Sequence, residues 1–401
     1  MPLGWIDFSK TERSKVLSVL DMLSEDATLD ELGIAPVRDG YANLFFPGTS
    51  TVQTRAKYFF IVPYGLRDME CSEEIHPGRV QTAFSALERA CGEQFLADNA
   101  GEEGVIGKRS LAAGRWVKRS PADIYWAGLR KYGIFNGGTM SLGEYIRAMC
   151  ALKEQKSTLK KLGSKKEAAE ENETDDADAG DVRSYQFWNM PLYRKEWKDD
   201  LCIALSKEEG AFLKSQILLT CPDSMMSFIL KNDMREVLSC DGFRELQMYI
   251  DRFPEHIQRD YAAARAFSDF IYAIRTVYNV ILSDGENLDA NRELERLLPA
   301  FPELAGIDID AIFARLALWH NPALRVFLKT SQELMRNRDV EGLKNCIKNR
   351  EIALKGQSRA KTCHPGQFEN GWYGGGQLGY RFGNAKVIMT DIFQSEVTAH
   401  A

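Results

Sequence analysis

The spacing of apolar residues predicts a mainly helical chain. The clearest pattern covers residues 255–282, where apolar side chains return at steps of three and four residues. This spacing places them on one face of a helix, which Asp284-Gly285 is expected to end. The apolar positions are Ile257, Tyr261, Ala264, Phe267, Ile271, Ile274, Tyr278 and Ile281.

Residues typical of helix starts predict further helices. A proline in the first turn, preceded by a capping residue, is typical of a helix N-terminus. Such signals predict helices that begin at Ser120-Pro121 and at Asn321-Pro322, and Pro77 predicts another that runs to about residue 98. Ser9 with Glu12 fits a capping box and predicts an N-terminal helix.

Two segments interrupt the helical pattern. Residues 104–118 have short runs punctuated by glycine, which predicts a hairpin or loop and, with the helices around it, a winged-helix-like unit. Residues 153–183 have almost no apolar content, and Glu170 to Asp181 hold seven carboxylates in twelve residues. Such a stretch cannot bury enough surface to offset its ordering entropy, so it predicts a disordered linker.

The predicted fold is therefore mainly α, with two domains and a minor β-hairpin. The N-terminal helical domain covers residues 1–152, the charged linker 153–183, and the helical C-terminal domain 184–401. The last of these ends in a glycine-rich loop and a helix.

The composition argues against several classes of protein, namely membrane-spanning, disulfide-rich and zinc-binding proteins. The chain has 401 residues, and its longest apolar runs fall short of the roughly 20 residues that span a bilayer. Since the N-terminus also lacks the apolar core of a signal peptide, a cytoplasmic protein without membrane contact is expected. Eight cysteines contain no C-x2-C pair, which argues against a disulfide framework and a structural zinc site. No metal or cofactor is expected.

The charge is unevenly distributed. The whole chain carries a net charge of −6, yet residues 104–147 hold eight basic and two acidic residues, a local charge of +6. Residues 328–386 hold eleven basic and five acidic residues, again +6. Local excesses of this kind decide where a polyanion binds, so these two basic segments are candidates for binding nucleic acid.

The segment 41–62 predicts a recognition helix. Pro47-Gly48 breaks the chain, and the hydroxyl residues that follow are good helix caps. Gln53, Arg55 and Lys57 then lie in the first turns. Gln and Arg pair with base edges, and Lys neutralises phosphates. The alternative is a surface helix whose polar end is only solvated.

The basic segment 104–135 is the second candidate. Its aromatic residues alternate with cations, an arrangement that suits stacking on unpaired bases together with phosphate contacts. The alternative is that the aromatic residues form core and the cations form a solvated face. The candidate binding residues are Lys108, Arg109, Arg115, Lys118, Arg119, Arg130 and Lys131.

The glycine-rich loop 371–383 is the third candidate. It precedes a helix predicted near Asn384, and backbone N–H groups at such a helix start, with Arg381 and Lys386, could hold a phosphate. The alternative is a structural turn that packs its aromatic residues. The loop spells G-x-G-x-x-G, but too few residues follow it for a dinucleotide-binding unit.

The sequence shows no motif that assigns a catalytic activity. Asp39, Asp123, Glu144 and Asp391 could serve as ligands of a metal-dependent nuclease, yet no nuclease motif connects them. No catalytic residue is assigned, and a non-enzymatic protein is favoured.

Four motifs carry a family resemblance. They are GWIDFS at 4–9, LDELGIAPVRDGYANLFFPGTSTVQTRAKYFF at 29–60, RSPADIYWAGLRKYGIF at 119–135 and LGYRFGNAKVIMTDI at 378–392. Together they resemble an uncharacterised bacterial family associated with antiphage defence operons, Azaca-like systems among them, that also encode a helicase and a phospholipase-D-type nuclease. The resemblance implies a role in antiphage defence beside these operon-encoded partners, and together with the basic segments it leads us to expect a DNA-binding, non-catalytic subunit. A divergent metal-dependent nuclease and a helical adaptor without nucleic-acid binding are the alternatives.

Overall fold

The computed structural model describes residues 30–167, 187–368 and 371–397. The helix predicted from Ser9 and residues 168–183 of the predicted linker lie outside these ranges. The chain forms two compact units, each built from separate stretches of sequence. Unit 1 comprises Met1–Phe46 and Ser239–Gly383, and unit 2 comprises Pro47–Leu238 and Asn384–Ala401.

This division differs from the predicted domain boundary at 153–183, because residues on both sides of that segment belong to unit 2. After the segment, the chain returns to the same core that it left. The Trp188 indole N–H donates to the Tyr145 hydroxyl at 2.9 Å, and the Trp188 and Phe135 rings lie 5.0 Å apart.

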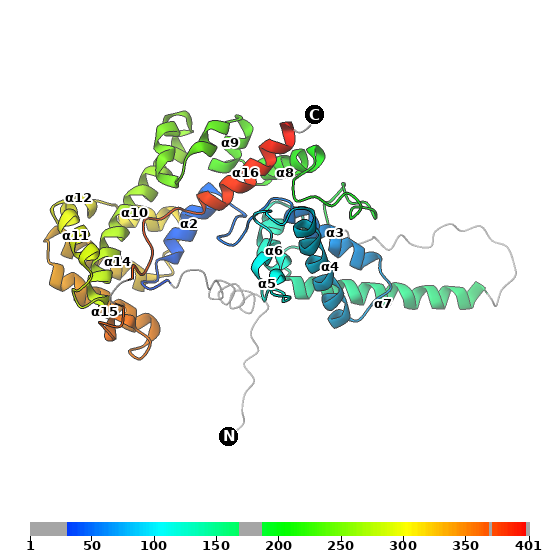
Figure 1. Ribbon diagram of the computed structural model, residues 1–401, viewed down its shortest axis with the longest axis horizontal. Helices are drawn as coiled ribbons and strands as arrows, with labels where there is room; N and C mark the ends of the chain where they lie inside the picture. The colour runs from blue at the N-terminus through cyan, green and yellow to red at the C-terminus, as the bar shows by residue number, and fades with distance from the viewer. Residues whose placement is uncertain (1–29, 168–186, 369–370, 398–401) are drawn as a thin grey trace, which may run out of the picture. The chain divides into compact units, whose positions relative to one another are not determined.

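Unit 1 is built around one long helix, α10, which confirms the helix predicted from the apolar spacing. From Ile271 to Leu282 every residue of α10 except Tyr272 is buried. Asp284 and Gly285 end it with positive φ angles of 51° and 85°. The helices of unit 1 are α2 (Ala35–Phe45), α10 (Glu255–Leu282), α11 (Leu288–Leu297), α12 (Phe301–Leu304), α13 (Ile309–Arg315), α14 (Pro322–Arg336) and α15 (Val340–Lys355), with a 3-10 helix, η2, at Phe243–Arg252 (Figure 1).

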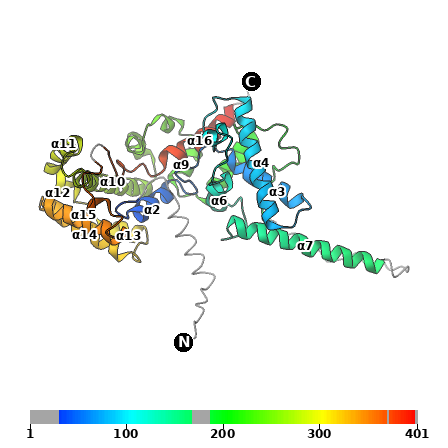
Figure 2. The ribbon, with the colours of Figure 1, turned by 60° about the horizontal axis from the view of Figure 1, so that its bottom comes forward.

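Unit 2 is organised around α3 (Tyr58–Cys71), whose first nine residues, Tyr58 to Leu66, are all buried. Helices α4 and α6 pack on it. The end of α7 extends away from these helices in both views (Figures 1 and 2). The other helices are α4 (Pro77–Asp98), α5 (Lys108–Ala112), α6 (Pro121–Lys131), α7 (Leu142–Glu167), α8 (Lys207–Thr220), α9 (Met225–Lys231) and α16 (Phe382–Val397), the first two residues of α16 falling in unit 1.

Three of the predicted helix starts are confirmed. Helix α4 begins at Pro77, and α14 begins at Pro322 with the Asn321 side chain accepting from the Leu324 N–H. At α6, Ser120 and Asp123 form a complete capping box. Throughout the part of the chain that the structure describes, none of the helices combines the length and apolar character needed to cross a bilayer.

The predicted β-hairpin does not form at residues 104–118, and the winged-helix-like unit is not confirmed. Gly104, Gly107 and Gly114 all have positive φ, so the chain turns every few residues and cannot extend into paired strands. The short helix α5 forms between two of these glycines. Within the described residues, the only isolated β pairing is a single antiparallel bridge between Phe135 and Trp188.

Close packing of α6 gives a first testable prediction. A Cβ atom at Gly128 would lie 2.5 Å from the Gly48 carbonyl oxygen and 2.8 Å from the Phe59 ring. We expect Gly128→Ala to lower the free energy of unfolding by about 1–3 kcal/mol in urea titrations, although alanine is the better helix former. Gly143→Ala on α7 is the control, because its nearest neighbour is the end of the Arg147 side chain at 3.6 Å. Equal stability of Gly128→Ala and wild type would contradict this packing.

Candidate nucleic-acid interface

The recognition helix predicted after Pro47-Gly48 does not form. The chain turns through this segment, and α3 begins only at Tyr58. Gln53 is 2% exposed, and its amide closes a local turn. The Gln53 Nε2 group donates to the Gly48 carbonyl, and its Oε1 atom accepts from the Ser50 N–H, both at 3.1 Å. The amide is therefore used inside the protein and is not presented to a base.

Arg55 is likewise held by hydrogen bonds and ion pairs within unit 2. Its Nε atom lies 3.0 and 3.1 Å from the two carboxylate oxygens of Asp391, and Nη1 lies 2.8 Å from Glu102 Oε1. Asp391 also accepts the Ala56 N–H at 2.7 Å. Burial raises the pKa of Asp391, while the Arg55 and Ala56 donors oppose that rise. This cluster anchors the start of α3 to α16.

Lys57 forms a buried ion pair. Its Nζ atom lies 2.9 and 2.8 Å from the two carboxylate oxygens of Glu209, and the two residues are 7% and 6% exposed. Glu209 is also the third residue of α8 and completes its capping box with Ser206. The prediction that Gln53, Arg55 and Lys57 face solvent is wrong, because hydrogen bonds and ion pairs within unit 2 hold all three.

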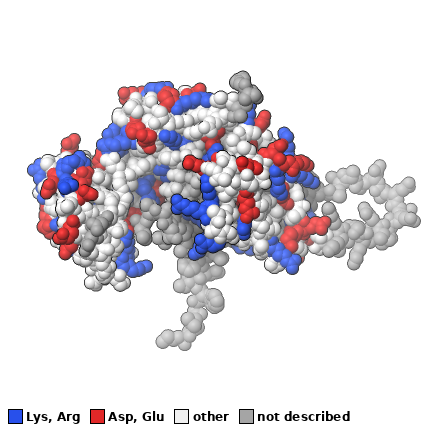
Figure 3. Space-filling view, in the orientation of Figure 1, with Lys and Arg blue, Asp and Glu red and all other residues white. Residues whose placement is uncertain are grey.

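The basic segment of unit 2 is different. We call its seven cations the basic face. They lie on α5, on the loop 113–120 and on α6, and Figure 3 shows basic side chains gathered over this part of unit 2. None makes an ion pair with a residue that the structure describes. The seven are Lys108, Arg109, Arg115, Lys118, Arg119, Arg130 and Lys131; Lys108 and Arg119 are half-buried and the others exposed.

Two of these cations bind only backbone carbonyls. Lys108 Nζ donates to the Glu102 carbonyl at 2.7 Å, and Arg130 Nη1 donates to the Thr139 carbonyl at 3.0 Å. A carbonyl orients a cation without neutralising it, so the positive charge stays available. Beside them, Gly104, Gly107 and Ser110 line an open hollow of about 520 Å³ that also includes Lys108 and Arg109.

Apolar packing supports the basic face from below. Leu111 and Trp116 lie over Gly92 of α4, where a Cβ atom would come within 3.1 and 3.8 Å of them. The Glu88 carboxylate of α4 accepts the Ala122 N–H at the start of α6. These contacts hold α5 and the loop 113–120 in place.

The aromatic residues of the segment are mostly core. Tyr125, Trp126, Tyr132 and Phe135 are all buried. The Tyr125 hydroxyl accepts the Thr54 N–H and donates to the Arg55 carbonyl, each at 2.8 Å. Stacking of these rings on unpaired bases is therefore ruled out in this arrangement, and the surface offers cations for phosphate contacts.

The second basic segment, 328–386, is partly neutralised by ion pairs. Lys355 and Lys361 both pair with Glu31, and Lys355 also pairs with Glu351 at 2.9 Å. Arg350 is buried and donates to the Leu32 carbonyl at 2.9 Å. Part of the segment's local excess of positive charge is thus offset by acids such as Glu31, which lies elsewhere in the sequence, whereas the basic face has no ion pair with a described residue.

The glycine-rich loop fits its structural alternative. The Asn279 side chain holds the backbone of Tyr373 through two hydrogen bonds, and Tyr380 is buried. Arg381 pairs with Asp39 at 3.2 Å and donates to Asn43, so its predicted role at a phosphate is corrected to a structural one. Lys386 is half-buried on α16.

The four carboxylates considered as nuclease ligands all have structural partners. Asp39 pairs with Arg381, Asp391 pairs with Arg55, and Asp123 and Glu144 bond the backbone at the starts of α6 and α7. In the described ranges, no three His, Cys, Asp or Glu side chains gather in a way that suits a metal ion.

Comparison with known proteins adds a family relation for part of the chain. Residues 1–168 match a family of unknown function, DUF6361. This range includes three of the four motifs noted in the sequence and the whole basic face. No curated protein and no solved structure matches the chain. The relation to an uncharacterised family is thus supported over the DUF6361 region.

Proposed function

We propose that this protein binds nucleic acid, most readily duplex DNA, through the basic face of unit 2. The observation that carries the proposal is a group of seven cations without a carboxylate partner among the described residues, in a chain whose net charge is −6. Uncompensated cations on an acidic protein cost self-repulsion and favour a polyanion as partner.

The chemistry of the face favours the phosphate backbone. Arginine and lysine side chains neutralise phosphates and release counterions, which gives affinity without sequence preference. Since the neighbouring rings are buried, base stacking contributes little. Duplex DNA, with its dense line of phosphates, suits such a face better than unpaired bases do.

Replacing four cations tests the proposal. The face variant carries Arg115→Ala, Lys118→Ala, Arg119→Ala and Lys131→Ala. We expect its affinity for a fluorescein-labelled 30-base-pair duplex to fall about 100-fold or more in anisotropy titrations at low salt. The slope of log K against log salt should become shallower by about 0.9 for each phosphate that the variant no longer neutralises.

A matched control separates the face from net charge. Arg194→Ala, Lys195→Ala, Lys207→Ala and Lys231→Ala remove the same charge from exposed positions of unit 2. This control should bind like wild type. Equal losses in both variants, or no binding by wild type, would refute the face as the site. Absence of binding together with co-purification of a partner protein would favour the adaptor alternative.

We further propose a non-catalytic role in antiphage defence, with a separately encoded helicase and nuclease acting on the DNA that this protein holds. The family resemblance of the N-terminal and C-terminal motifs supports this context, and the structural partners of the four carboxylates support a non-catalytic subunit. Cleavage of DNA by the purified chain with Mg²⁺ or Mn²⁺ would instead support the nuclease alternative.

A further inference from the structure

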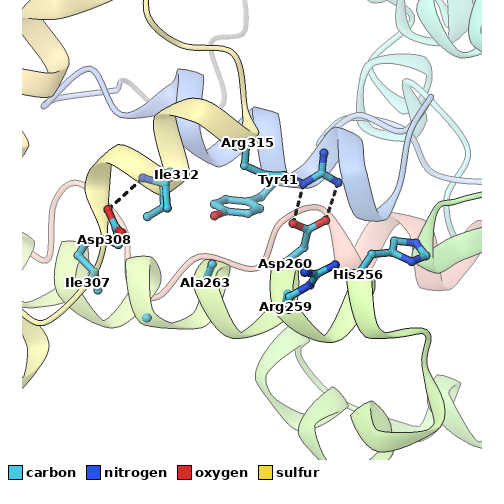
Figure 4. Close-up of a pocket in the computed structure, with 11 residues that line it drawn as sticks. Tyr41, His256, Arg259, Asp260, Ala263, Ile307, Asp308, Ile312 and Arg315 are labelled. Carbon is cyan, nitrogen blue, oxygen red and sulfur yellow. Dashed lines mark hydrogen bonds and ion pairs between the residues drawn. The ribbon is translucent and has the colours of Figure 1, made fainter.

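Unit 1 contains a cavity that the proposed function does not use. It has a volume of about 500 Å³ and lies among α2, α10 and α13 (Figure 4). Ligand pockets commonly have volumes of about 300–1,000 Å³. The cavity therefore has the size of a small-molecule site.

The sequence explains why this space stays open. Helix α10 lines it with positions 256, 259, 260, 263 and 266, which fall on one helical face. Two of these are alanines, Ala263 and Ala266, and α13 contributes Ala311. Small side chains on both helices leave a gap, while Ile307 and Ile312 give it apolar walls.

Tyr41 places a hydroxyl without a partner in this cavity. The residue is 1% exposed, and its ring is held by Phe45 and Tyr380, with ring centres 6.0 and 5.9 Å away. Figure 4 shows its ring between α10 and α13, with the hydroxyl pointing toward Ile312. No residue that the structure describes forms a hydrogen bond with this hydroxyl.

The hydroxyl oxygen is not among the fully buried polar atoms that lack a partner, so it is reached from the cavity and offers a free hydrogen-bonding group to a ligand there. Burial, followed by the charge of Asp260, raises the pKa of Tyr41 above its usual value. The phenol is therefore neutral and able to donate a hydrogen bond to a ligand.

The other end of the cavity supplies positive charge. Arg315 binds Asp260 through Nε and Nη2, both at 2.8 Å, which leaves its Nη1 donors unused by that pair. Arg259 is exposed at the cavity and makes no ion pair with a described residue. The Arg315–Asp260 pair is neutral, and Arg259 adds a cation without an ion pair at this end, while the Asp308 carboxylate lines the opposite end.

We propose that the cavity binds a small organic anion. Its phosphate or carboxylate group lies at Arg259 and Arg315, and its apolar body lies against Ala263, Ala266 and Ile312. The Tyr41 hydroxyl donates to a polar atom of that body. This site is independent of the basic face, because every residue that lines it belongs to unit 1.

Isothermal titration calorimetry on the full chain tests the proposal with two anions, AMP and 4-phenylbutyrate. Their uncharged analogues, adenosine and 4-phenylbutan-1-ol, serve as controls. At least one anion should bind more tightly than its analogue. AMP alone would identify the phosphate as the preferred group, and 4-phenylbutyrate alone would identify the carboxylate.

Three variants assign the binding to the cavity. Arg259→Ala should weaken it about 10- to 100-fold, and Tyr41→Phe about 3- to 10-fold. Tyr41→Phe should keep or raise the melting temperature without ligand, because the removed hydroxyl has no partner in the protein. Ala263→Leu should fill the space and abolish binding, while Ala262→Leu, at an exposed position of α10 outside the cavity, should not.

Three results would overturn the proposal: neither anion binds, the uncharged analogues bind equally well, or Ala263→Leu and Tyr41→Phe bind as wild type does. A fall in the melting temperature of Tyr41→Phe without ligand would also overturn it, since the hydroxyl would then be structural.

Discussion

Replacing Lys57 by methionine should lower the free energy of unfolding by about 3–5 kcal/mol. The methionine keeps the volume of the lysine stem but leaves the Glu209 carboxylate buried without its cation. Glu209 is only 6% exposed, so water cannot take the place of the ammonium group. Urea titrations followed by circular dichroism measure this decrease.

A double variant distinguishes the buried charge from a change in packing. Lys57→Met with Glu209→Gln removes both charges, and the glutamine still accepts the Ser206 N–H that Glu209 Oε2 accepts at 2.9 Å. We expect it to recover most of the stability, to within about 1 kcal/mol of wild type. If the double variant is as unstable as Lys57→Met, the ion pair is not the cause.

Glu88 should make the protein less stable as the pH rises. It is 2% exposed on α4, and burial raises its pKa from 4.5 to about 8, although the Ala122 N–H opposes the shift. An acid whose pKa is higher in the folded state favours folding when protonated. Its contribution is therefore complete below pH 4.5 and is lost as the pH rises to about 8.

The size of the pKa shift of Glu88 determines how far the free energy of unfolding should fall. Each pKa unit corresponds to about 1.4 kcal/mol, so the free energy of unfolding should fall by roughly 4–5 kcal/mol over this range. Glu88→Gln keeps an acceptor for the Ala122 N–H and should remove most of that pH dependence. Glu93→Gln, an exposed position on the same helix, is the control. A Glu88→Gln profile that parallels wild type would show that Glu88 does not titrate in this range.

Local sequence signals predict the helices well. Helix α10 follows from its apolar period, and α6 from Ser120-Pro121, because both signals depend on residues within a few turns. A local signal of the same kind gives a wrong prediction for the segment Gln53 to Lys57, where the expected recognition helix does not form. There the deciding partners, Asp391 and Glu209, are 336 and 152 positions away from Arg55 and Lys57.

Counting charges along the sequence fails for the same reason, because it leaves out ion-pair partners that are distant in the sequence. Segments 104–147 and 328–386 have equal excess charge in the sequence, but the seven cations of the basic face make no ion pair with a described residue, whereas Lys355, Lys361 and Arg381 of the second segment do. Lys361 of the second segment pairs with Glu31, 330 positions away, which no local count includes. The cavity is harder still to predict, because alanines on a helical face also occur wherever helices pack closely.

Photo-crosslinking tests the central claim most directly. A 30-base-pair duplex that carries 5-bromodeoxyuridine is irradiated with the full chain at 50 mM salt, and the attached peptides are identified by mass spectrometry. We expect crosslinked peptides from residues 108–131, which are absent in the face variant and kept in the control with four exposed cations removed. Crosslinks confined to unit 1, or none in wild type, would contradict it.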